Sequence, residues 1–203
     1  MRARYVSDMA NNFFGVATMR LIYGPAVLAG VMLGFNPAIA SDVKPTFLVG
    51  ISAGGDDLVT TSDRDLQAGG LLYFGAGLTY EPENNPLIYR TTIGYKFNFV
   101  EFDTPSGEST LTSLPIDFLG LYRTGRTMFG VGLVYDVNPE WELCIGGCAT
   151  VKFDDAVGYA FEFDYDLSDT GFFGLRYTDI DYEANGAKLD ASNIRLHFGA
   201  KFN

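Results

Sequence analysis

The sequence predicts an all-β fold in which eight antiparallel strands follow one another up and down and close into a barrel. Three observations support this prediction. Apolar and polar residues alternate with a period of two in eight segments, and the connections between these segments alternate between short turns and long loops. The chain of 203 residues has the length of one domain, and its 24 glycines and 15% aromatic residues favour an all-β protein over a helical enzyme.

The N-terminal segment has the layout of a secretory signal peptide. Arg20 precedes the apolar run "LIYGPAVLAGVMLGF", and small residues precede a predicted cleavage before Ser41. The run is shorter than the roughly 20 apolar residues that a helix needs to cross a membrane. Translation from Met19 would give a signal of conventional length. We therefore expect the signal to occupy residues 1–40 and the barrel to occupy residues 41–203.

The first three predicted strands set apolar side chains against small or polar ones. Phe47–Gly54 alternates Phe, Val, Ile and Ala with Gly and Ser, and Leu72–Tyr80 alternates apolar residues with Tyr, Gly and Thr. Leu87–Phe99 shows the pattern most clearly, because Arg90 and Lys96 both fall on the face opposite its aromatic residues. At about a dozen residues, this strand exceeds the five to six that are common in soluble proteins.

The next three predicted strands carry acidic residues on their polar face. Leu114–Tyr122 sets Asp117 against apolar side chains, although two leucines blur its alternation. Phe129–Val137 sets Asp136 and two glycines against apolar residues. Val157–Tyr165 alternates aromatic residues and valine with Gly, Ala, Glu and Asp. Each segment fits a strand with one apolar and one polar face.

The last two predicted strands carry basic residues on their polar face. Phe173–Thr178 sets an arginine against Phe, Leu and Tyr. Asn193–Phe202 sets Arg195, His197 and Lys201 against five apolar residues. These two strands complete the set of eight.

The connections alternate in length along the chain. Three are short and rich in Pro, Gly, Asn and Asp, and four are longer and mostly acidic. Short periplasmic turns, long external loops and both chain ends on the periplasmic side are typical of outer-membrane barrels. The short turns are Glu81–Pro86, Arg123–Arg126 and Asp166–Thr170, and the long loops are Gly55–Gln67, Glu101–Ser109, Asn138–Thr150 and Glu183–Asp190.

The apolar faces are expected to point outward. The lumen of an eight-stranded barrel is just wide enough for side chains, so the apolar and aromatic residues of eight strands would overfill it. Turned outward, they form a lipid-facing band with aromatic girdles at both interfaces. The prediction is therefore an eight-stranded antiparallel up-and-down transmembrane β-barrel. The girdle residues are Phe47, Tyr80, Tyr89, Tyr122, Phe129, Tyr165, Phe173 and Phe202 toward the turns, and Phe99, Tyr135, Phe153 and Tyr177 toward the loops.

The eight-strand pattern over Thr46–Asn203 and the closing "LHFGAKF" resemble the small eight-stranded outer-membrane barrels of the OmpA transmembrane domain and OmpX type. The resemblance implies a monomer in the outer membrane of a Gram-negative bacterium, in contact with lipid and lipopolysaccharide. It also implies insertion by the barrel-assembly machinery, which reads an aromatic residue at the end of the last strand. Phe202 is the matching residue, although Asn203 follows it.

The polar faces bring ten ionisable residues toward the barrel interior. An unpartnered buried charge costs several kcal/mol, so we expect these residues to form a paired network that plugs the lumen. A charged, water-filled pore is the alternative, because inward-facing glycines leave some room. The expected network contains Arg90, Lys96, Asp117, Asp136, Glu162, Asp164, Arg176, Arg195, His197 and Lys201.

His197 is the only histidine of the chain, and we assign it to this network and not to catalysis. Lipid A-modifying barrels of similar size use a His with a nearby Ser, whereas Ser192 lies five residues away and therefore on the opposite strand face. The sequence predicts no catalytic, cofactor or metal site.

Cys144 and Cys148 are expected to form a disulfide, because the chain is exported to an oxidising compartment. Metal binding is a weaker alternative for two thiols without a nearby histidine. The acidic loops are expected to be solvated, with cation-bridged contacts to lipopolysaccharide as the alternative. The chain has 14 Lys and Arg against 25 Asp and Glu, which argues against a nucleic-acid partner.

These features predict a non-enzymatic envelope or surface protein that interacts through its external loops. A narrow, porin-like channel for small solutes is the first alternative, and a lipid-modifying enzyme is the second.

Overall fold

The computed structural model describes residues 42–60, 65–103 and 106–202. The predicted signal peptide lies outside these residues. Eight strands form the barrel, and each coincides with one of the eight predicted strands over all or nearly all of its predicted length, which confirms the predicted fold class. Within the described ranges, no helix is long and apolar enough to cross a membrane. The barrel strands are β1 (Val43–Ala53), β4 (Leu72–Tyr80), β5 (Leu87–Asp103), β6 (Ser106–Thr124), β7 (Thr127–Cys144), β9 (Ala156–Asp166), β10 (Gly171–Asp179) and β13 (Asn193–Lys201).

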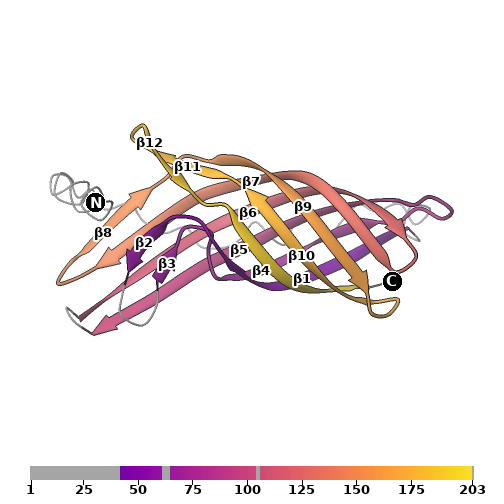
Figure 1. Cartoon of the computed structure of the whole chain (residues 1–203), viewed down its shortest axis with the longest axis horizontal. Coiled ribbons are helices and arrows are strands. Elements are labelled where there is room, and N and C mark those ends of the chain that lie inside the picture. Colours follow the sequence, from indigo (N-terminus) through magenta and orange to yellow (C-terminus); the bar gives the residue numbers. More distant parts are fainter. Residues whose placement is uncertain (1–41, 61–64, 104–105, 203) are drawn as a thin grey trace, which may run out of the picture. The chain divides into compact units, whose positions relative to one another are not determined.

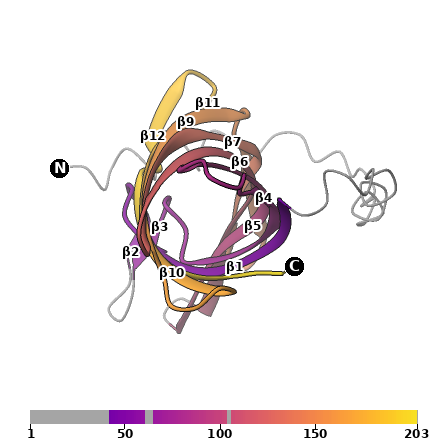
Figure 2. The same ribbon diagram turned by 90° about the vertical axis from the view of Figure 1, so that its right-hand side faces the viewer.

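Antiparallel pairing closes the sheet into a ring. The barrel strands lie in the order β6, β5, β4, β1, β13, β10, β9 and β7, and pairing between β6 and β7 completes the circle. Figure 2 shows the strands surrounding a common axis. In Figure 1 the short strands β2, β3, β8, β11 and β12 lie at one end of the barrel, whereas the short turns and the C-terminus lie at the other. We call these the loop end and the turn end.

Burial alternates along the barrel strands, as a period-two pattern requires. In β9, every second residue from Ala156 to Asp164 is buried, and the residues between them face outward. Large apolar side chains remain exposed on the outer face, including Val157 at 64% and Phe161 at 54%. Such exposure is unfavourable in water and favourable in lipid, so the outward orientation of the apolar faces agrees with the sequence prediction.

Two of the predicted loops are largely strand in the structure. The segment Glu101–Ser109 continues the ladder between β5 and β6, with Glu101 paired to Glu108. The segment Asn138–Thr150 belongs mostly to β7 and to β8 (Cys148–Lys152). The acidic composition had indicated loops, but an antiparallel ladder that leaves the membrane can carry polar residues on a face exposed to water.

The other two long connections fold into small hairpins. One contains β2 (Asp57–Thr60) and β3 (Asp65–Gln67), and the other contains β11 (Asp181–Ala184) and β12 (Ala187–Asp190). A backbone hydrogen bond of 2.8 Å from Asp56 to Asp190 joins the two connections.

Apolar side chains from both hairpins, from the connections beside them and from three barrel strands form a cluster at the loop end, which we call the cap. Phe153, predicted for the aromatic girdle, instead packs against the cap, with its ring 5.6 Å from that of Tyr182. The backbone N–H of Phe153 donates to the carbonyl oxygen of Pro139, which holds the segment that follows β8 against β7. The buried residues of the cap are Leu58, Leu66, Ala68, Val100, Leu111, Ala156, Ile180, Tyr182 and Ala191.

Candidate functional site

The ten residues of the expected interior network all point into the barrel, and none is more than 6% exposed. They do not form one network. The structure divides them into a central group, a group beneath the cap and a group at the turn end.

The central group is built around Glu162. One of its carboxylate oxygens lies 2.6 Å from Nη1 of Arg90, and the other accepts a hydrogen bond from Nε of Arg176. Arg176 also donates to Asp117 over 2.7 Å. Asp117 accepts further hydrogen bonds from Thr92 at 2.9 Å and Tyr73 at 3.2 Å, so both Glu162 and Asp117 have at least two donors.

Arg195 enters this group mainly through an aromatic ring. Its guanidinium lies 3.7 Å from the centre of the Tyr73 ring, whereas its nearest carboxylate oxygen, on Asp117, is 3.9 Å away. Stacking on an aromatic face is a favourable contact for a buried guanidinium. Tyr73 was not among the predicted network residues, because it lies near glycines on a strand without charged residues.

A glycine brings His197 and Asp164 together. Gly174 on β10 pairs with Asp164 of β9 on one side and with His197 of β13 on the other. Nε2 of His197 lies 2.9 Å from Oδ1 of Asp164, directly across the glycine. A Cβ at Gly174 would overlap both side chains. The contact between His197 and Asp164 therefore requires a glycine at position 174.

Glu162, Asp164 and His197 could in principle hold a metal ion, because one ligand atom from each lies within 4.8 Å of the others. Arg90 and Arg176 occupy the carboxylates, however, and their charges would repel a cation. His197 is fully buried and has Asp164 as its polar partner. These observations favour a structural role for the central group.

The group beneath the cap consists of Lys96, Asp136 and Tyr182. Lys96 donates to Asp136 at 3.1 Å and to the Tyr182 hydroxyl at 2.7 Å. The Tyr182 hydroxyl donates to Asp136 at 2.5 Å. Because Tyr182 also belongs to the cap, its side chain contacts the apolar cap with its ring and the charged interior with its hydroxyl.

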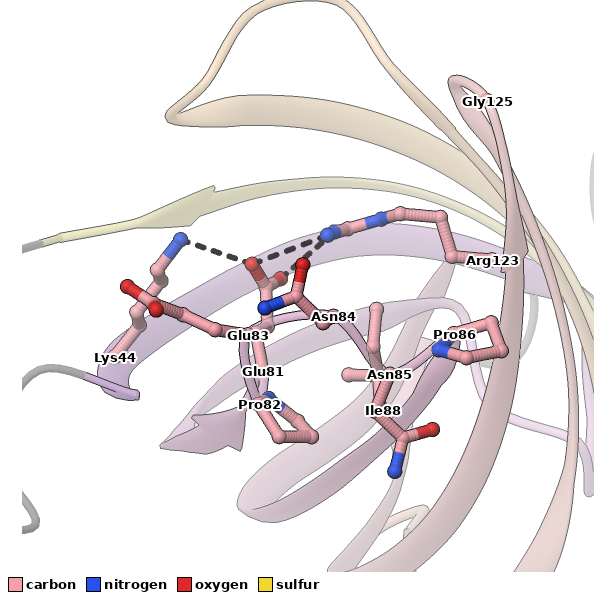
Figure 3. Close-up of a pocket in the computed structure, with 10 residues that line it drawn as sticks. All are labelled: Lys44, Glu81, Pro82, Glu83, Asn84, Asn85, Pro86, Ile88, Arg123 and Gly125. Atoms are coloured by element: carbon pink, nitrogen blue, oxygen red, sulfur yellow. Dashed lines mark hydrogen bonds and ion pairs between the residues drawn. The ribbon is translucent and has the colours of Figure 1, made fainter.

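The turn-end group surrounds Glu81, which lies in one of the predicted short turns. Lys44 and Arg123 reach its carboxylate from opposite sides, at 2.9 and 3.0 Å (Figure 3). Lys201 donates to Glu81 at 2.8 Å and to Asp166 at 3.0 Å. Burial opposes the charge of Glu81, but hydrogen bonds from Lys201, Lys44 and Arg123 outweigh it and lower the Glu81 pKa to about 2. The group borders an open hollow of about 520 Å³.

At the loop end, three barrel strands extend into a projecting sheet. Strands β5, β6 and β7 contain 17, 19 and 18 residues, whereas each of the other five barrel strands contains 9 or 11. About 9–11 residues are enough to cross a membrane. The surplus residues of β5, β6 and β7, together with β8, form a four-stranded sheet beyond the barrel wall.

The projecting sheet has an acidic outer face. Glu108, Glu140 and Glu142 lie on this face, and the nearby Lys152 is paired to Glu140 at 3.0 Å. Among the described strands, β8 pairs with β7 alone, so its other edge has no strand partner. On the inner face, Trp141 packs against the cap, and its indole N–H donates to Ser109 at 2.8 Å.

A disulfide joins Cys144 and Cys148 at the tip of the projecting sheet. The two residues lie directly opposite each other at the end of the β7–β8 ladder. At the opposite end of the barrel, Phe202 follows β13, and its ring packs edge-on against Phe47 at 5.8 Å on the outer face.

No protein-family model and no curated protein sequence matches the chain. Several solved structures resemble it, among them the following three. Ail, the attachment invasion locus protein of Yersinia pestis, solved with the heparin analogue sucrose octasulfate, matches with a TM-score of 0.54 at 11% identity, over 79% of this chain and 97% of Ail. Neisserial surface protein A matches with a TM-score of 0.49 at 12% identity, over 80% of this chain and 97% of that protein. The outer membrane protein OprG from Pseudomonas aeruginosa matches with a TM-score of 0.42 at 16% identity, over 79% of this chain and 94% of OprG.

The likeness to Ail shows a shared fold. The chain has the fold of the small eight-stranded outer-membrane β-barrels, as its sequence predicted. Because this closed barrel carries a continuous apolar exterior, it is a membrane protein of the bacterial outer membrane.

Proposed function

We propose that the protein is a non-enzymatic surface protein, in which the barrel is an anchor and the projecting sheet makes the interactions. The observation that carries this proposal is the extension of β5, β6 and β7 well past the length of a membrane crossing. Since short turns face the periplasm in outer-membrane barrels, the projecting sheet would lie outside the cell.

The interior supports an anchor over a channel. The buried charges are paired in three groups, and the cap lies over the loop end. In planar bilayers we expect no ion-conducting steps from the protein. Conductance with a selectivity that changes in Arg90 or Glu162 variants would favour the channel instead.

The enzyme alternative has a separate test. His197 is buried against Asp164 and away from lipid, so we expect expression of the protein to leave the mass of lipid A unchanged. A change of mass that disappears in a His197→Ala variant would establish a lipid-modifying enzyme.

The charge of the projecting sheet indicates the kind of partner. Ail was solved with a highly sulfated, anionic ligand. The outer face of this sheet carries Glu108, Glu140 and Glu142, and the whole chain has a formal charge of −11. Opposite charge favours encounter and suppresses partners of like charge. We therefore infer a cationic polypeptide as the partner and not a polyanion.

Binding to immobilised poly-lysine and to heparin tests this inference. Protein in nanodiscs should bind poly-lysine and not heparin, and replacement of Glu108, Glu140 and Glu142 by Gln should weaken poly-lysine binding. The matched control replaces three exposed carboxylates at the same end but outside the sheet, Asp179, Asp181 and Glu183, by their amides. Equal loss in both variants would mean that only net charge matters, and would contradict a specific role of the sheet.

Assembly and oligomeric state complete the proposal. We infer that the barrel-assembly machinery recognises Phe202, that the protein is a monomer, and that its loop end contacts lipopolysaccharide. The exposed ring of Phe202 next to Phe47 supports the first inference. A Phe202→Ala variant that appears in the outer membrane at the rate of the parent would contradict it.

A further inference from the structure

The tip of the β7–β8 hairpin combines two sulfurs with a carboxylate. Cys144 and Glu142 lie on the same face of β7, and Sγ of Cys144 is 3.8 Å from a carboxylate oxygen of Glu142. Cys148 lies opposite Cys144 on β8. One ligand atom from each of these three side chains lies within 4.8 Å of the other two.

We propose that this tip is a redox-gated zinc site, which binds Zn²⁺ through Cys144, Cys148 and Glu142 when the disulfide is reduced. Thiolate sulfur and carboxylate oxygen are both ligands of zinc in proteins, and three protein ligands with water in the fourth position make an open tetrahedral site. In the oxidised form that the structure describes, the sulfurs are bonded to each other and hold no cation.

The change between the two forms is chemically balanced. A dithiol or phosphine reductant supplies two electrons, the S–S bond breaks, and two protons complete two thiols. Binding of Zn²⁺ then releases both thiol protons, because the thiolate is the form that coordinates a metal. After the ion is removed, a disulfide oxidant or molecular oxygen takes two electrons from the two thiols, two protons leave, and the S–S bond forms again.

The backbone allows the sulfurs to separate to the distance that a shared metal requires. The turn between the cysteines contains Gly146 and Gly147, and a Cβ at either position would meet no atom within 4 Å. Gly146 adopts φ +67°, a conformation that favours glycine. The ladder pairs Glu142 with Thr150, which keeps the two cysteines facing each other in either form.

The surroundings favour a cation at this position. Glu108 of β6 pairs directly with Cys144 and is exposed, so it adds negative charge next to the sulfurs. The nearest basic residue on the face, Lys152, is held by Glu140. The Thr150 hydroxyl lies 3.5 Å from the second carboxylate oxygen of Glu142, a contact that can orient this ligand.

Cobalt provides the test, because Co²⁺ bound to thiolate shows a charge-transfer absorption that neither component has alone. The refolded mature barrel in detergent is reduced with a phosphine and titrated first with Co²⁺ and then with Zn²⁺. We expect the reduced protein to take up one Co²⁺ with the thiolate band, Zn²⁺ to displace it, and the oxidised protein to show no band.

Variants then assign the ligands. Cys148→Ser should abolish the band, and Glu142→Gln should weaken Zn²⁺ binding by at least about tenfold. Glu183→Gln is the matched control, because Glu183 is an exposed carboxylate at the same end of the barrel but outside the projecting sheet, and this variant should bind as the parent does. Heat-dependent mobility in SDS verifies that each variant is folded. Absence of the band in reduced parent protein, or unchanged binding by Glu142→Gln, would overturn the proposal.

Discussion

At the scale of single residues, Glu162 holds the centre of the barrel together, because its carboxylate lies between the guanidinium groups of Arg90 and Arg176. Glu162→Gln keeps the shape of this side chain and removes its charge. Two buried guanidiniums then lose their shared counterion, and we expect the free energy of unfolding to fall by about 3–5 kcal/mol. Urea unfolding in lipid vesicles measures the change.

The control for this substitution is Glu83→Gln, which changes the same chemical group at an exposed position in a short turn. It should leave the free energy of unfolding within about 0.5 kcal/mol of the parent. Equal stability of the two variants would show that the central pairing contributes nothing.

Gly174 is a second residue at which a substitution should lower stability, because its lack of a side chain permits the contact between Asp164 and His197. In Gly174→Ala the new methyl group would push Asp164 and His197 apart, and we expect a loss of about 1–3 kcal/mol from overpacking. Gly120→Ala is the control, because a Cβ at this strand position meets only the carbonyl of Val131, at 4.0 Å. Urea unfolding in lipid vesicles measures the free energy of unfolding of both variants. Equal values would mean that neighbouring side chains move to accommodate the methyl group of Gly174→Ala, and would contradict the expected overpacking.

At the scale of single elements, the two faces of a strand should respond differently to substitution. Phe161 on β9 faces outward, so Phe161→Arg would place a charge in lipid and should cost about 2–4 kcal/mol near the midplane. Thr92 on β5 faces inward and donates to Asp117, and Thr92→Ser retains this hydroxyl and should cost little. Similar losses in unfolding free energy for both variants would contradict the assignment of faces.

The turn between β4 and β5 should confer a pH dependence. The pKa of Glu81 is about 2 in the folded protein against an ordinary value of 4.5, so its ion pairs stabilise the fold fully above pH 4.5. That contribution is lost as the pH falls from 4.5 toward 2, where the folded carboxylate takes up a proton. The stability difference between the parent and Glu81→Gln should therefore shrink over this range. A difference that is constant from pH 6 to pH 2 would exclude the proposed ion pairs.

At the scale of the whole molecule, closure of the sheet leaves no open edge in the barrel wall, since β6 pairs with β7. We expect the native barrel to resist SDS at room temperature, and boiling to change its electrophoretic mobility. The protein should fractionate with the outer membrane. A single mobility before and after boiling, with the protein in the soluble periplasm, would contradict a membrane barrel.

The sequence predicted the strands and their faces well, for a physical reason. Each residue of a barrel strand faces either the lipid outside or the charged interior. Because side chains alternate between these two faces, the position of a residue in the alternation predicts which of the two it faces. The same reasoning put Arg90, Glu162 and Arg195 on the inner face of their strands, and the structure buries all three side chains.

The grouping of these residues could not be predicted in the same way. Alternation gives the face of a residue but not its height along the barrel axis, which depends on the register between neighbouring strands. Lys201 was expected with the central carboxylates, and register places it beside Glu81 and Asp166 at the turn end instead. Glu81 and Tyr73 were not included, because one is in a turn and the other is uncharged.

The position of Trp141 makes it an intrinsic fluorescence probe of the loop end. It is the single tryptophan of the chain, and it lies on the projecting sheet, outside the barrel segment that lipid surrounds. Its indole is fixed by Ser109 and the cap, so its emission will respond to events at the loop end and hardly to the lipid around the barrel. Emission from unmodified protein can therefore follow binding to the projecting sheet in real time.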